Sequence, residues 1–129
     1  MYRILSAALV AAALAISTTA HAKKITCTFD SWSSKKKETA PRWLGKGFRV
    51  DTNRNTVKIL GGGQYHYTLP IDKINERKSK TTYTVFKISK DENNTYKDRY
   101  SFSVSSKNVG RVTLSSPGFE LLRASGTCK

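Results

Sequence analysis

Histidine, carboxylate and arginine side chains are the usual groups for acid–base catalysis, and this sequence offers few of them in a useful pattern. His66 is the only histidine beyond residue 22. With Tyr65, Glu76 or Arg77 it forms one conceivable acid–base set for cleaving RNA. The alternative interpretation is a half-exposed histidine between two strand tyrosines, Tyr65 and Tyr67. Because no Gly-x-Ser-x-Gly motif and no second such histidine are present, we expect no catalytic residues and no enzymatic activity.

In length, basicity and an export segment, the chain resembles small secreted microbial ribonucleases. That resemblance implies two histidines, or a Glu-Arg-His set with its histidine near the C-terminus. Here His66 lies in the middle of the chain, so at least one expected residue is missing. A small secreted ribonuclease therefore stays an alternative function and not the leading one.

Cys27 and Cys128 are the only cysteines, and they bracket almost the whole chain after residue 22. In an exported protein a pair placed in this way predicts one disulfide between the first and last elements. Closing a loop of about 100 residues contributes roughly 4–5 kcal/mol in the chain-entropy model. Two cysteines and a distant histidine lack the spacing of a metal site, so we expect neither a metal nor another cofactor.

Positive charge is the strongest functional signal. The chain has 23 Lys and Arg against 9 Asp and Glu, a net charge of +14. Removing residues 1–22 takes away a single basic residue, Arg3, and leaves about +13. Such a surface attracts anionic polymers, and the attraction weakens as salt screens it. The basic residues form two denser groups, which are Lys35, Lys36, Lys37 and Arg42, and then Lys73, Arg77, Lys78 and Lys80.

Residues 30–46 are the longest irregular stretch that we expect, and we predict the binding site there. Long loops on small β scaffolds commonly carry binding residues. The predicted site residues are Trp32, Lys35, Lys36, Lys37, Arg42 and Trp43. Indoles interleaved with cations add stacking on bases or sugars. Alternatively, either indole caps an open end of a barrel.

The elements that would carry these residues are β-strands. Apolar residues alternate with polar ones in several segments, as in Ile25, Cys27 and Phe29. Polar turn signals such as 52–55 and 91–94 separate the segments. We predict an all-β antiparallel meander of seven or eight strands, closing into a small barrel or a related sandwich. Residues 69–78 fit either a strand or a single helical turn. The aromatic residues expected to point inward are Phe29, Phe48, Tyr83, Tyr100, Phe102 and Phe119.

Residues 1–22 have the features of a signal peptide. Arg3 precedes a 13-residue apolar stretch at 4–16, and the segment ends Ala20-His21-Ala22. The stretch is too short to span a bilayer. We therefore expect one domain at 23–129, without a transmembrane segment, in the periplasm or secreted. The chain is too short for a large multilayer enzyme.

These observations favour an exported, monomeric, non-enzymatic β-domain that binds an anionic polymer or envelope component through its basic surface and the residues around Trp32 and Trp43. Nucleic acid is a less favoured anion of the same kind. A protein–protein module, such as a secreted enzyme inhibitor or adhesion factor using Trp32 and Trp43 as anchors, is the second hypothesis.

Overall fold

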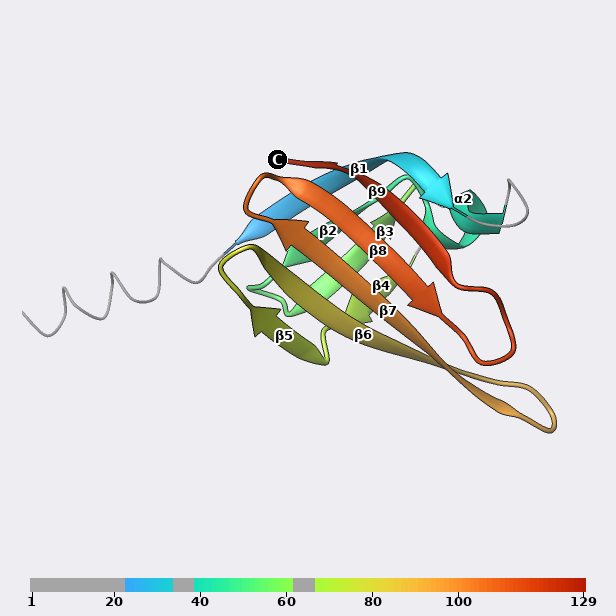
Figure 1. Cartoon of the computed structure of the whole chain (residues 1–129). Coiled ribbons are helices and arrows are strands. Elements are labelled where there is room, and N and C mark those ends of the chain that lie inside the picture. The colour runs from blue at the N-terminus through green and yellow to red at the C-terminus, as the bar shows by residue number, and fades with distance from the viewer. Residues whose placement is uncertain (1–22, 34–38, 62–66) are drawn as a thin grey trace, which may run out of the picture.

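The computed structural model describes residues 23–33, 39–61 and 67–129 of the chain. Within these ranges no helix has the length and apolar character needed to cross a membrane. The described elements are one short helix and nine strands (Figure 1). Their bounds are β1 Lys24–Ser33, α2 Thr39–Leu44, β2 Gly47–Asp51, β3 Thr56–Leu60, β4 Thr68–Pro70, β5 Lys73–Glu76, β6 Lys80–Lys90, β7 Thr95–Ser105, β8 Val109–Ser115 and β9 Leu122–Cys128.

All nine strands are antiparallel and belong to one sheet in the order β4-β3-β2-β1-β9-β8-β7-β6-β5, which curls into a half-barrel (Figure 1). The all-β prediction is confirmed. Two meanders, β1 to β4 and β5 to β9, meet where β1 pairs with β9. We refer to this pairing as the seam, because it alone joins the two meanders side by side in the strand order.

The strand number differs from the expected seven or eight because residues 68–76 form two short strands and not one. The chain turns between them at Ile71 and Asp72. The Ile71 N–H donates to the Asn55 carbonyl on the β3 side, and the Asp72 N–H donates to the Thr84 carbonyl on β6. The same short segment thus bonds to both ends of the sheet, and the curled shape follows.

The predicted disulfide is confirmed, and it crosses the seam. Cys27 of β1 pairs directly with Cys128 of β9, and their sulfur atoms are 2.05 Å apart. Gly110 of β8 lies against this bond, since a Cβ at that position would be 2.7 Å from the Cys128 sulfur. A side chain of any size at position 110 would therefore displace the disulfide.

The interior of the half-barrel is filled with large apolar side chains. Phe48 and Phe102 pack across it with ring centroids 4.9 Å apart, and Tyr100 stacks on Phe102 at 5.8 Å. Burial raises the pKa of the Tyr100 hydroxyl, because the phenolate would lose its hydration. Five of the six aromatic residues expected inside are buried, namely Phe29, Phe48, Tyr83, Tyr100 and Phe102.

The expectation for Phe119 was wrong, since its side chain is 73% exposed. Phe119 lies in the connection between β8 and β9, and β9 begins only at Leu122. Its N–H donates to the Ser116 carbonyl and closes a turn. A turn residue is not bound by the strand alternation on which the expectation was based.

Residues 30–46 are not one irregular stretch, which corrects the sequence interpretation. Strand β1 continues to Ser33, and α2 occupies Thr39–Leu44. The helix buries Ala40 and Leu44, which lie four residues apart on one face. It ends at Gly45, which has a φ of 72° and whose N–H donates to the Pro41 carbonyl. A glycine in this left-handed conformation is a common helix terminator.

A β-bulge at Asp30 changes which face of β1 each residue occupies. Phe29 pairs with Gly126 and Ser31 pairs with the preceding residue, Ser125, so Asp30 is the extra residue. Side chains alternate between the two faces of a strand, and an inserted residue reverses the alternation beyond it. Phe29 and Trp32 therefore share the inner face, whereas Ser31 and Ser33 point outward.

The disulfide should stabilise the sheet without being needed to define it. We expect the Cys27→Ala/Cys128→Ala variant to keep its far-UV β signal and to lose about 2–5 kcal/mol of unfolding free energy, because the open chain has more unfolded conformations. Urea unfolding of both proteins measures the loss. An unchanged midpoint, or two free thiols in the unreduced wild type by mass spectrometry, would contradict this expectation.

The bulge makes a second prediction. Deleting Asp30 should remove the bulge and leave Phe29, Ser31, Trp32 and Ser33 in simple alternation. Trp32 then stays on the inner face, so the unfolding free energy should fall by about 1 kcal/mol or less. Asp30→Ser is the matched control, which keeps the bulge and should stay within about 0.5 kcal/mol of wild type. In urea unfolding, a loss above about 3 kcal/mol in the deletion variant would contradict this expectation, because it would mean that Trp32 had left the core.

Candidate functional site: a groove on the outer face of the sheet

The outer face of β1, β9, β8, β7 and β6 presents hydroxyl and guanidinium groups in two adjacent rows, which follow from the strand register. The first row is Ser31, Ser125, Arg111, Ser103 and Thr82. The second row is Ser33, Arg123, Thr113, Ser101 and Thr84. Neighbours within a row have Cβ atoms about 4.5–5.5 Å apart, and the rows are about 7 Å apart along each strand. Neither row contains a carboxylate.

A shallow groove of about 470 Å³ lies over β1, β9 and β8 in these rows. Its polar lining is Ser31, Ser33, Arg111, Thr113, Arg123 and Ser125. Val112 and Ala124 complete the lining; both are buried core residues. The groove is therefore a surface of paired strands from which two cationic side chains rise among hydroxyls.

The two arginines of the groove have no internal counter-charge among the described residues. Arg111 and Arg123 are both exposed. Within the described residues the ion pair joins Arg54 to Asp51, at 3.9 Å, and neither arginine of the groove takes part in it. Arg111 lies opposite Ser125 while Arg123 lies opposite Thr113, so the two arginines are diagonal neighbours on adjacent strands. Their positive charges are available to a ligand.

The two predicted indoles pack against the core. Trp32 is half-buried, meets Phe29 edge to face with ring centroids 6.3 Å apart, and donates from Nε1 to the Gly45 carbonyl at 3.0 Å. Trp43 of α2 is also half-buried and packs against the core. These contacts support the alternative in which the indoles cap the interior.

The remaining predicted site residues lie beside the groove in the sequence. Arg42 is exposed on α2, which packs against β9 and β1. Lys35, Lys36 and Lys37 fall within 34–38, outside the described residues. Ser33 lines the groove and immediately precedes this segment. Three of the predicted site residues thus follow the groove-lining Ser33 closely in the sequence.

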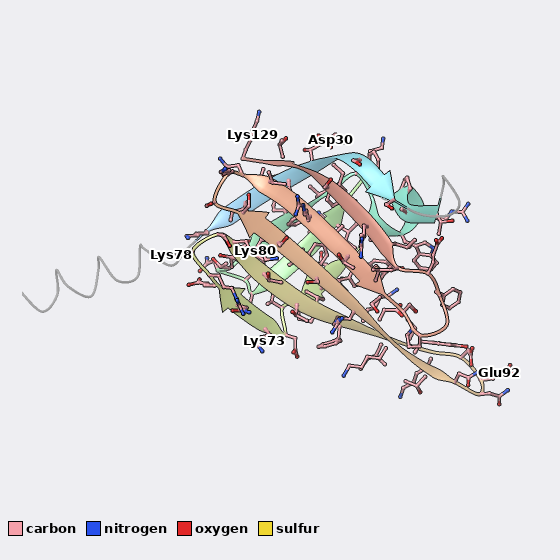
Figure 2. All side chains as sticks on the ribbon, viewed as in Figure 1. Asp30, Lys73, Lys78, Lys80, Glu92 and Lys129 are labelled. Carbon is pink, nitrogen blue, oxygen red and sulfur yellow. A yellow bond between two sulfur atoms is a disulfide. The ribbon has the colours of Figure 1, made fainter. Side chains whose placement is uncertain are left out.

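The second basic group gathers on the β5–β6 hairpin, as the labelled Lys73, Lys78 and Lys80 in Figure 2 show. All residues of β5 are exposed, and β5 is an edge strand. Lysine on an edge strand discourages pairing with another chain. Protection of this edge explains the second basic group, but it does not explain the two arginines of the groove.

The described residues do not show the candidate catalytic side chains assembled into one site. Tyr65 and His66 lie outside the described residues, and Glu76 and Arg77 are exposed. In the described ranges, no three His, Cys, Asp or Glu side chains come together as metal ligands. The buried carboxylate of Asp51 accepts the N–H groups of Asn53 and Arg54 in its own turn.

One further polar cluster lies away from the groove, on β6 and β7. Lys87 pairs with Asp98 across the strands, and its ammonium stands 3.7 Å from the centroid of the Tyr67 ring. The Asp98 Oδ1 atom is buried, and no hydrogen-bond partner for it occurs within the described residues.

Sequence reasoning missed Arg111 and Arg123, although a signal for them exists. Arginine occurs at 99, 111 and 123, near the beginning or middle of three consecutive strands, each time followed by alternating Ser or Thr. That alternation marks one solvent-facing side of each strand. Only the register, however, places Arg111 and Arg123 next to each other.

Comparisons of the chain with family models, with curated proteins and with solved structures find no match.

The contacts of Trp32 predict a structural role. Trp32→Ala should lower the unfolding free energy by about 3 kcal/mol or more, because it removes a large core contact and leaves the Gly45 carbonyl unpaired. Arg42→Ala, a neighbouring exposed change, should stay within about 0.5 kcal/mol. Denaturant titrations compare the two. If the Trp32 variant were as stable as wild type, the indole would have no structural role and would again be a candidate for ligand binding.

Proposed function

We propose that this protein is an exported, non-enzymatic β-domain that binds an anionic polymer or envelope component through the outer face of β1, β9 and β8. The observation that carries the proposal is the groove containing Arg111 and Arg123, which are exposed and without an acidic partner among the described residues. Charged groups left without an internal partner at a concave surface are suited to an external counter-charge.

The surroundings of the groove support the same function. Ser31, Ser33, Thr113 and Ser125 add hydroxyl groups that donate to anionic oxygens. A strongly positive net charge attracts a polyanion to the molecule, and in this proposal the groove is where the polyanion binds. The apolar stretch at 4–16 and the disulfide support an oxidising, extracytoplasmic location.

A protein–protein module remains the second candidate, and one observation favours it. Phe119 and Leu121 are large apolar side chains exposed on the β8–β9 connection, at 73% and 43%. Exposed apolar groups mark contact surfaces when they are contiguous. They flank the end of β8 and not the groove lining, so this second function would use different residues.

Binding to charged dextrans tests the leading proposal. Phosphorylated dextran and carboxymethyl dextran are the anionic probes, and neutral dextran is the blank. We expect the wild type to bind at least one anionic probe, with affinity that falls as salt rises. Arg111→Gln/Arg123→Gln should weaken this binding about tenfold or more, because two direct charge contacts are lost at the groove.

The matched control removes the same charge elsewhere. Lys73→Gln/Arg77→Gln takes two cations from the β5 end of the sheet and should weaken binding less than about threefold, as a long-range effect only. Calorimetry gives the affinities, and thermal unfolding checks that both variants stay folded. Equal losses in the two variants would mean that the charge acts diffusely and the groove is not the site.

A further inference from the structure

We infer that the groove recognises phosphate monoester groups, in preference to carboxylates or to the bases of a nucleic acid. This inference rests on the proposed function and adds the chemical class of the bound anion. It depends on the number of donors at the groove, on their placement, and on what the lining lacks.

The two guanidinium groups start from neighbouring positions on the outer face. Arg111 and Arg123 are diagonal neighbours on paired strands, and the Cβ atoms of such neighbours are about 7–8 Å apart. An arginine side chain is long enough for both planar forks to reach one anion between them. Each guanidinium carries five N–H donors in a fixed geometry.

The number of acceptor oxygens then separates the candidate anions. A carboxylate has two oxygens, and a single guanidinium in bidentate contact engages both. A phosphate monoester has three terminal oxygens in a tetrahedral arrangement and a charge of about −1.5 to −2 near neutral pH. It can therefore accept from both arginines at once, and its charge matches theirs.

The hydroxyl groups fit the same anion. Ser125 lies opposite Arg111, and Thr113 lies opposite Arg123, so each guanidinium has a hydroxyl beside it across the strand pair. Ser31 and Ser33 continue the two rows on β1. Donors on both flanks of the arginine pair can reach oxygens that point away from the guanidinium planes.

The lining residues that the structure describes include no aromatic side chain, which argues against bases and neutral sugars. Proteins that hold single-stranded nucleic acid stack bases on exposed aromatic rings. The aromatic residue nearest in sequence to the groove lining on β1 is Trp32, and its indole packs against Phe29 on the inner face. Apart from Val112 and Ala124, the described lining offers a ligand charge and hydroxyl groups.

A charge-conserving substitution tests this inference. Phosphorylated and carboxymethyl dextran are matched in charge density and titrated separately, with oligothymidylate as the phosphodiester probe that carries bases. We expect wild type to bind phosphorylated dextran at least about tenfold more tightly than either other probe. Arg111→Lys/Arg123→Lys keeps the net charge but loses the forked donors, so it should lose this preference and keep the weaker carboxymethyl dextran binding.

The control is Arg54→Lys/Arg77→Lys, two exposed arginines outside the groove lining, which should keep the full preference. Equal binding of the two dextrans by wild type would overturn the phosphate preference and leave the proposed function standing. A preference retained by Arg111→Lys/Arg123→Lys, or tighter binding of oligothymidylate, would also overturn it. Binding of none of the probes would overturn the proposed function and this inference together.

Discussion

The pairing of β1 with β9 is the interaction on which the rest of the structure depends. The chain builds two separate antiparallel meanders, and the seam turns them into one curled sheet with a common interior. The disulfide between Cys27 and Cys128 ties the seam covalently. Glycine makes this close packing possible, since a side chain at Gly110 would collide with the sulfur atoms and one at Gly126 would collide with the β1 backbone at Thr28.

The register at the seam also decides which side chains are buried in the core and which lie on the outer face. Trp32, Ala124, Val112, Phe102 and Tyr83 form one inward row across five strands, and the hydroxyl and arginine rows lie on either side of it on the outer face. Because strand residues alternate, a shift of one residue at the seam would exchange the two sets. The packing that buries Trp32 is thus the same packing that exposes Ser31 and Ser33. Stability of the core and the composition of the groove are consequences of one register.

Under the function that we propose, the outer face of β1, β9 and β8 acts in recognition. Hydroxyls and guanidinium groups on regular strands hold fixed positions, and a rigid scaffold lowers the entropic cost of binding. Arg42 is exposed on α2, which packs against β9 and β1, so this predicted site residue lies outside the groove lining.

The sequence by itself determined the fold class and the covalent link. Alternating apolar residues predicted the strands, and two cysteines at the chain ends predicted their bond, because both signals are local or depend only on a count. It misplaced Phe119, and it treated residues 30–46 as a loop, since a turn, a bulge and a six-residue helix leave weak patterns. Only the tertiary structure decided the strand order, the reversal at Asp30 and the meeting of Arg111 with Arg123. Each depends on register between strands distant in the chain, and register is set by how whole strands pack and not by the residues of any one of them.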